Sequence, residues 1–283
     1  MPTLHILGAG TPSPTPELFG TSCLVQVGHD LVMVDCGPAT TWKMVRAGFR
    51  AIDLGWLLFT HHHSDHNADY PCLQMVRWDH CIGGEEPLHV YGPPPTEEIT
   101  QKLFGPEGAF ADDFTARVSH VASHRCHIER GGALPRPGPV FDAHDVVAGA
   151  IIEGEGWSAR CAASEHMQPW MESVTWRMDW EGGSVAFTGD TRPCASVVEL
   201  ARGVRTLVAN CPLRQERLHE DLASCIYGTM DAAGAARDAG AERLVLIHLS
   251  QSLIRDADAA IAEMAEVYDG EIVIGEEMMA LDL

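Results

Sequence analysis

Basic residues are scarce in this chain. It holds 19 lysines and arginines against 40 aspartates and glutamates, so its formal net charge is −21. Nucleic-acid affinity comes largely from lysine and arginine side chains that displace counterions from the phosphate backbone. The acidic balance therefore argues against a nucleic-acid partner and favours a small-molecule substrate, although a local basic patch would escape the average.

Paired cysteines, long apolar runs and a leader segment are also missing. The nine cysteines are scattered, odd in number and form no CxxC pair, which indicates reduced thiols. The start MPTLHILGAG lacks the basic region and apolar core of a secretory signal. No window approaches the roughly 20 apolar residues of a membrane span. We therefore expect a cytoplasmic protein that contacts no membrane.

The chain does contain many short apolar runs bounded by glycine and proline, which predict strands. Strands come first, then a mixture of strands and helices, and this order occurs twice, which suits a layered α/β architecture. The length allows one sizeable core, and we expect a single domain over residues 1–283. Residues 105–145 are rich in Gly, Pro and His with a weak apolar period, which predicts an irregular, lid-like insertion.

Four histidines and an aspartate are crowded into the stretch LGWLLFTHHHSDHNADY, directly after an apolar run. In a nearly extended chain alternate side chains share a face, so His61, His63 and Asp65 point one way and His62 the other. His66, at the start of a helix, can turn back toward the first face. A solvated loop is the simpler alternative, but converging imidazoles and a carboxylate suit zinc, with manganese or iron also possible.

One such cluster cannot complete two metal sites, and three more candidate ligands follow apolar strands. They are His166 in ASEHMQPW, Asp190 in VAFTGDT and His248 in LVLIHLS. Taken singly, each histidine also suits a buried core residue, and the aspartate suits a turn. All three nevertheless occupy strand ends, where α/β folds gather their active sites.

The chain resembles the metallo-β-lactamase superfamily, specifically its ribonuclease Z and arylsulfatase-like branch. The histidine cluster, FTGDT, LIHLS, VDCGPAT and PLHVYGPPP carry the resemblance. It implies an αββα sandwich of two central mixed sheets with outer helices, a dinuclear zinc hydrolase, and a homodimer. It also implies the metal ligands: His61, His63 and His166 for one ion, Asp65, His66 and His248 for the other, and Asp190 as a bridge.

A hydroxide shared by two metals would attack an ester-type substrate, with Asp65 orienting it and taking its proton. We expect a small phosphodiester, carboxylic ester, lactone or sulfate ester, with Trp170 and Arg192 as substrate contacts. Transfer-RNA 3′ processing is disfavoured, because Asn210 stands where that branch carries a Glu. The branch's histidine is also missing near Tyr227, and His219, a few residues earlier, is the candidate substitute. A metal-binding protein without turnover is the other alternative.

Overall fold

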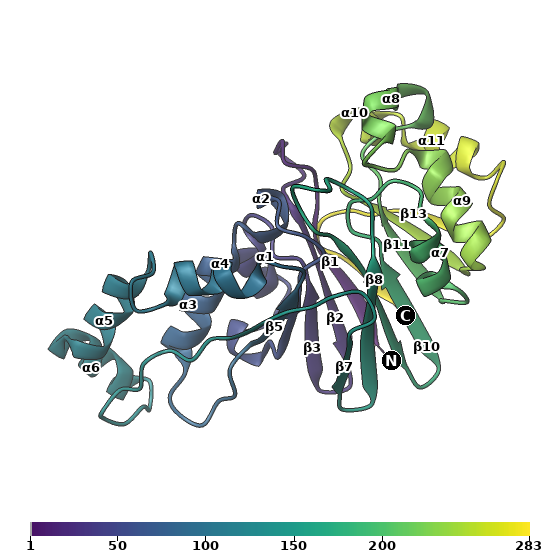
Figure 1. The fold of residues 1–283 in the computed structure, drawn as a ribbon. Helices are drawn as coiled ribbons and strands as arrows, with labels where there is room; N and C mark the ends of the chain where they lie inside the picture. Colours follow the sequence, from purple (N-terminus) through teal and green to yellow (C-terminus); the bar gives the residue numbers. More distant parts are fainter. Residues whose placement is uncertain (1) are drawn as a thin grey trace.

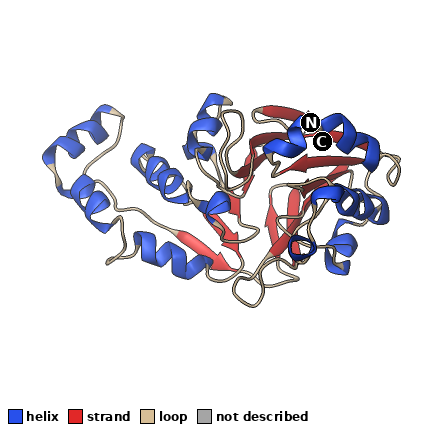
Figure 2. Ribbon diagram, turned by 90° about the horizontal axis from the view of Figure 1, so that it is seen from above, coloured by secondary structure: helices blue, strands red, loops and turns tan. Residues whose placement is uncertain are grey.

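The computed structural model describes residues 2–283, which form two seven-stranded mixed sheets stacked face to face, with helices on the outer faces (Figures 1 and 2). In spatial order the first sheet consists of β14 (Met279–Asp282), β1 (Thr3–Ala9), β2 (Thr21–Val27), β3 (Asp30–Val34), β4 (Trp56–Leu58), β5 (His89–Gly92) and β6 (Asp142–Asp145). The second consists of β13 (Glu271–Ile274), β12 (Arg243–Ile247), β11 (Thr206–Asn210), β10 (Gly183–Phe187), β9 (Val174–Trp180), β8 (Trp157–Ala163) and β7 (Ile151–Gly154). The predicted αββα sandwich is confirmed.

The helices divide between the two outer faces. Those of the first half are α1 (Thr40–Arg46), a 3₁₀ turn (Ala51–Asp53), α2 (Ser64–Asn67), α3 (Tyr70–His80), α4 (Thr96–Phe104), α5 (Ala111–Ser119) and α6 (Val121–Glu129). Those of the second half are α7 (Ala195–Ala201), a 3₁₀ turn (Gln215–Arg217), α8 (Glu220–Ala223), α9 (Thr229–Ala239), α10 (Gln251–Arg255) and α11 (Ala257–Met264). Among the described residues, no helix combines the length and apolarity needed to cross a membrane.

Each sheet changes from antiparallel to parallel pairing along its width. Strands β3 to β6 run parallel in the first sheet, and β10 to β13 run parallel in the second. Strand β12 has an almost fully buried RLVLI sequence, as expected for a parallel strand covered on both faces. Parallel strands deliver their carboxyl ends to one edge of a sheet, so the loops after β3, β4, β10 and β12 share an edge of the sandwich.

The inner faces of the sheets form the larger of two apolar cores. Val25, Val185 and Leu244 contribute to it and are fully buried. Trp176 on β9 is also fully buried, and its indole Nε1 donates to the carbonyl of Phe59, 2.9 Å away. That bond ties the second sheet to the backbone just ahead of the histidine cluster, so the position of the cluster is fixed by the core.

Glycine is required where the two sheets meet beside the cluster. Gly189 follows β10 with φ +60°, a conformation that side chains with a Cβ rarely adopt. A Cβ there would lie 2.7 Å from Cβ of Thr60, the residue before His61. The turn that presents Asp190 can therefore approach the histidine loop only because residue 189 has no side chain.

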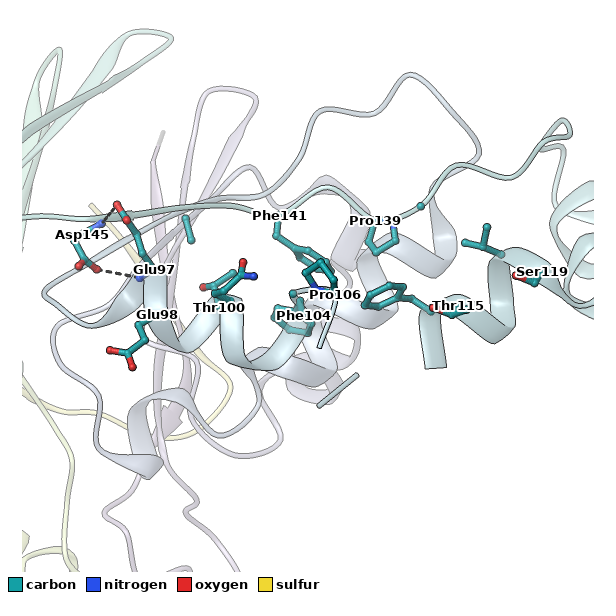
Figure 3. A pocket seen from close by; sticks show the side chains of 16 residues that line it. Glu97, Glu98, Thr100, Phe104, Pro106, Thr115, Ser119, Pro139, Phe141 and Asp145 are labelled. Carbon is teal, nitrogen blue, oxygen red and sulfur yellow. Dashed lines mark hydrogen bonds between the residues drawn. The ribbon is translucent and has the colours of Figure 1, made fainter. Parts of the chain in front are cut away.

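Residues 105–145, predicted to be irregular, contain helices α5 and α6, which extend from the body of the molecule in Figure 1. No side chain of α5 is buried, and only His127 of α6 is, which explains why the apolar period is weak. A cleft of about 1060 Å³ lies between this segment and α4 (Figure 3). Phe104 and Phe141 stack in it at a centroid distance of 4.3 Å. None of the predicted site residues lines this cleft, and the lid role stays a prediction.

Candidate metal centre

The backbone after β4 sets the direction of the histidines. Thr60 donates from its backbone N and from Oγ1 to the two carboxylate oxygens of Asp35, both over 2.8 Å. His63 is extended, with φ −66° and ψ 151°, and caps the short helix α2. The extended run therefore separates alternate side chains, and the helix that follows brings Asp65 and His66 back toward the same side.

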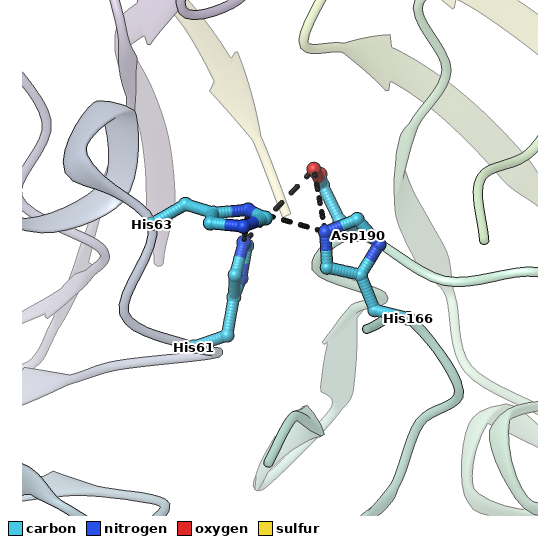
Figure 4. A group of neighbouring side chains, drawn as sticks. All are labelled: His61, His63, His166 and Asp190. Atoms are coloured by element: carbon cyan, nitrogen blue, oxygen red, sulfur yellow. Dashed lines mark hydrogen bonds and ion pairs between the residues drawn. The ribbon is translucent and has the colours of Figure 1, made fainter. Parts of the chain in front are cut away.

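The first group of side chains consists of His61, His63, His166 and Asp190, whose possible ligand atoms all lie within 4.8 Å of one another. Nδ1 of His63 lies 3.1 Å from Nε2 of His61 and 3.2 Å from Nε2 of His166. Figure 4 shows the rings of His63 and His166 directed at each other and toward Asp190. Three ring nitrogens that face one common point match the donor arrangement of a bound cation.

The second group consists of Asp65, His66 and His248. Nε2 of His248 lies 3.0 Å from Oδ2 of Asp65, and Nε2 of His66 lies 3.5 Å from the same oxygen. The carboxylate of Asp190 faces both groups: Oδ2 is 3.7 Å from Nε2 of His166, and Oδ1 is 3.7 Å from Nε2 of His66. The seven candidates from distant parts of the chain thus lie together.

His62 points away from both groups. Its Nε2 lies 2.7 Å from Oγ1 of Thr96 and 3.2 Å from the carbonyl of Pro93, next to the start of α4. Its role is to connect the histidine loop to the following helix. The structure thus separates His62 from its two neighbours, as the alternation of an extended chain requires.

Asp35 is a functional residue that the sequence analysis missed. It is buried, and its Oδ2 lies 2.7 Å from Nδ1 of His66. A carboxylate on one ring nitrogen orients the ring and leaves the other nitrogen free for a metal. The only signal was its place in VDCGPAT, a motif that suggested kinship but no role.

The buried ring nitrogens provide a test of whether a cation fits. Nε2 of His66 is buried, faces Asp65 and Asp190, and has no hydrogen-bond partner. Nδ1 of His166 lies 2.7 Å from the carbonyl of Cys225, so this ring also has one nitrogen engaged and Nε2 directed at the group. A buried nitrogen without a partner is costly unless something else binds it. A divalent cation satisfies these nitrogens and carboxylates together.

The electrostatics of the site also favour positive charge. Burial lowers the pKa of His61 well below its usual value, with His66 adding to the effect. Burial opposes charge on His66 too, but Asp35 and Asp190 outweigh it and raise its pKa to about 9. Burial likewise raises the pKa of Asp190, yet His248 and the other rings hold it well below the usual range. The carboxylates that favour a proton here would equally favour a metal ion.

The two predicted substrate contacts differ in whether their side chains are already engaged by a neighbour. Arg192 forms an ion pair with Glu165, which engages its guanidinium. Trp170, four residues after His166, leaves 85% of its surface exposed.

The structure shows what surrounds the three residues named where the sequence departs from the ribonuclease Z pattern. Asn210 ends β11 and donates from Nδ2 to Oδ1 of Asp190 over 2.7 Å. Tyr227 is fully buried in the core between the helices and the second sheet. His219 caps α8 with its side chain largely exposed and adjacent to Asp221.

Comparison with known proteins identifies the family. A family model described as a beta-lactamase superfamily domain matches residues 31–249. The chain belongs to the metallo-β-lactamase superfamily. It is 30% identical over 282 residues to a protein named Ribonuclease Z from Mycobacterium avium (strain 104), with 96% of this chain and 95% of that protein covered. This near-complete match assigns it to the ribonuclease Z branch.

Solved structures of the superfamily share its fold. The metallo-beta-lactamase fold protein YhfI from Bacillus subtilis superposes with a TM-score of 0.74 at 19% identity, covering 99% of this chain and 98% of that one. Human tRNase Z, short form, superposes with a TM-score of 0.68 at 18% identity, again covering 99% and 98%. With these relatives, the chain is a metal-dependent hydrolase that binds divalent metal, which sets aside the alternative without turnover.

The expectations of a small-molecule substrate and an unlikely nucleic-acid partner were wrong, because full-length relatives are named Ribonuclease Z. Net charge failed as a guide since it averages over the whole surface. At the base of the arm formed by helices α5 and α6, three arginines surround the single carboxylate of Asp79: Arg130 at 2.6 Å, Arg136 at 2.8 Å and Arg117 at 3.1 Å. Two of these arginines, Arg117 and Arg130, are half-exposed and place positive charge at this position of an acidic chain.

Proposed function

We propose that this chain is a ribonuclease Z-type endoribonuclease that processes the 3′ ends of transfer-RNA precursors. The observation that carries the proposal is the match to Ribonuclease Z over 96% of the chain, together with the cluster of seven candidate ligands. The name of human tRNase Z, a structural neighbour, supports the choice of transfer RNA.

We further propose that the centre holds two zinc ions. His61, His63 and His166 would hold one ion, Asp65, His66 and His248 would hold the other, and Asp190, which faces both groups, would contribute to both. Imidazole nitrogens and carboxylate oxygens are suitable zinc donors, and the unpartnered Nε2 of His66 supports the assignment. When bound, such a pair of ions supplies an activated water and stabilises charge on the phosphoryl oxygens.

Asp65 is the proposed proton acceptor. Burial raises the pKa of its carboxyl, but the hydrogen bond from His248 and the field of His66 outweigh burial and lower it. Asp65 is therefore ionised at neutral pH, and its oxygens can orient the attacking water and take its proton.

Arg117 and Arg130, the two half-exposed arginines beside Asp79, are the proposed contacts for the phosphate backbone, while Arg136 is buried against Trp78. One carboxylate cannot neutralise three guanidiniums, and Asp113 engages only Arg117. Excess positive charge on the base of the arm attracts RNA phosphates, while the acidic remainder of the surface repels them. RNA would therefore approach by this side of the molecule.

A cleavage assay tests the proposal. The protein, reconstituted with zinc, is incubated with a precursor transfer RNA that carries a 3′ trailer, and with mature transfer RNA as a control. We expect one cut at the 3′ end of the precursor, no cut in the mature RNA, and loss of cleavage on chelation with recovery on adding zinc or manganese. If the reconstituted protein hydrolyses bis(p-nitrophenyl) phosphate but leaves the precursor intact, the proposed substrate is wrong.

A further inference from the structure

The loop between β8 and β9, residues 164–173, is held closed by its own polar side chains. Ser164 donates from its backbone to the carbonyl of Ser173 over 3.1 Å. Gln168 donates from Nε2 to the carbonyl of Ser164 over 3.0 Å and accepts from the backbone of His166 over 2.8 Å. Gln168 also donates to Oγ of Ser173 over 3.2 Å, so one glutamine ties the backbone at the start of the loop to a side chain at its end, which makes the loop a rigid support.

Trp170 stands on this support with its indole uncovered. Its exposed fraction of 85% is the highest of any large hydrophobic side chain in the described residues. By contrast, Trp42 on α1 is 59% exposed and is covered by the guanidinium of Arg46, 4.7 Å from the ring centroid. The backbone N of Trp170 donates to the carbonyl of Met167 over 3.0 Å, which holds the residue in the turn.

The backbone of Trp170 lies within a bounded distance of the metal centre. His166 belongs to the same loop, and its Nε2 faces His63 and Asp190. Four residues of fully extended chain span at most about 14 Å, so the Cα atoms of His166 and Trp170 are no farther apart than that. A nucleotide next to a phosphate held at the centre is within reach of the indole.

Charge near the loop does not favour a phosphate contact there. Arg192 is the nearby cation, and Glu165 already pairs with it. The loop also carries Glu172, which repels phosphate. A flat aromatic surface without a free cation is suited to the face of a base, because base stacking on aromatic side chains needs no charge and tolerates any sequence.

We propose that Trp170 is a stacking platform for an unpaired base of the RNA, next to the phosphate that is cut. This proposal rests on the proposed ribonuclease function and adds a specificity-determining contact to it. It accounts for an exposed tryptophan on a rigid loop beside the centre, and it gives an acidic protein a means of holding RNA that does not depend on phosphate attraction.

The experiment uses zinc-loaded protein and two precursor RNAs that differ only in having a base or an abasic nucleotide beside the cleaved phosphate. Trp170→Ala should raise KM for the normal RNA by about 10- to 100-fold with little change in kcat. Trp170→Phe should recover most of the loss. With the abasic RNA, KM of the native protein should rise by the same factor. KM of Trp170→Ala should be the same for the abasic RNA as for the normal RNA. Trp42→Ala, a matched exposed tryptophan on α1, should behave like the native protein.

A second readout follows the base directly. With 2-aminopurine in place of the base, mixing with native protein should quench its fluorescence, and mixing with Trp170→Ala should not. An unchanged KM for Trp170→Ala, or an abasic penalty that persists in that variant, overturns the proposal. So does a change in the sedimentation of Trp170→Ala with KM unchanged, since the indole would then contact a second chain. If native protein cuts no RNA, the ribonuclease function itself fails.

Discussion

Asn210 donates a hydrogen bond from Nδ2 to Oδ1 of Asp190 over 2.7 Å, and both side chains are buried. Asp190 is the only candidate ligand that faces both groups of the centre. A neutral donor on its carboxylate fixes the rotation of that group without adding charge. Asn210 thus positions the residue on which the two halves of the site depend.

Replacing Asn210 with alanine should therefore weaken the centre. Loss of an outer hydrogen bond to a metal ligand typically costs 10–100-fold in metal affinity or activity, and we expect roughly that factor in zinc retention. Zinc release under competition with a chromophoric chelator measures it. Thr206→Val, on the same strand and also buried, removes a hydroxyl that bonds to nothing and serves as the control. Native retention in Asn210→Ala would contradict the positioning role.

Asp35 should act mainly on the metal position that contains His66, because it bonds to that ring directly and reaches His61 only through Thr60. Asp35→Asn keeps the shape of the side chain but removes the charge that orients His66 through Nδ1. We expect about 10–100-fold weaker binding of one zinc ion, and an almost unchanged affinity for the other. Isothermal titration of metal-free protein separates the two events. An equal loss at both positions would mean that Asp35 acts on the fold as a whole.

Neighbouring histidines provide a sharper comparison. His63→Ala should bring the zinc content close to one ion per chain and abolish RNA cleavage, because His63 faces His61 and His166. His62→Ala should retain both ions, since its ring is bonded to Thr96 on the opposite side. Metal analysis by mass spectrometry and a cleavage assay on both variants give the answer. Equal effects of the two substitutions would exclude the proposed ligand set.

Much of the centre was predictable because its residues follow strands. Alternation in the extended run places His61 and His63 on one face, and strand ends point to Asp190 and His248, whereas Asp65 reaches that face through helix α2 and not by alternation. Asp35 was not predictable, since its role depends on a turn with φ +60° that brings it beside Thr60, 25 residues later. Secondary structure depends on local patterns, whereas such contacts depend on tertiary packing.

The predictions for residues 105–145 and for the substrate were incomplete or wrong for a different reason. Helix α5 has only nine residues, and its apolar stripe of Phe114 and Val118 is partly buried, so the segment lacks the long apolar period by which helices are recognised. Net charge describes the whole surface and cannot show that Arg117, Arg130 and Arg136 gather at one carboxylate. Both properties are set by where exposed residues lie in space, about which composition contains no information.

Asp79 should make the stability of the protein depend on pH. Burial raises the pKa of its carboxyl, but Arg136, Arg130 and Arg117 outweigh burial and hold the pKa well below the usual range. A carboxyl with a depressed folded-state pKa contributes stability above its unfolded pKa of about 3.9, and this contribution is lost as pH falls toward the folded value. Asp79→Asn should therefore cost roughly 2 kcal/mol at pH 7, and less at pH 3.

Urea unfolding of both proteins at the two pH values measures that difference. Asp113→Asn removes an exposed partner of Arg117 and should cost under about 0.5 kcal/mol at either pH, as exposed ion pairs do. A cost for Asp79→Asn that is the same at pH 7 and pH 3 would show that the carboxylate charge is not responsible.

Removal of metal should destabilise the native fold by mass action. A ligand that binds only the folded chain adds about 2.7 kcal/mol at 100 times its dissociation constant, and the unpartnered Nε2 of His66 becomes costly once the ions leave. We expect the melting temperature of the native protein to fall when a chelator removes the metal. It should rise again on adding zinc, in proportion to the logarithm of the zinc concentration. Calorimetry of native protein and of His63→Ala, which should respond less, tests the linkage. If chelation leaves the melting temperatures of both proteins unchanged, the cluster is stable without cations.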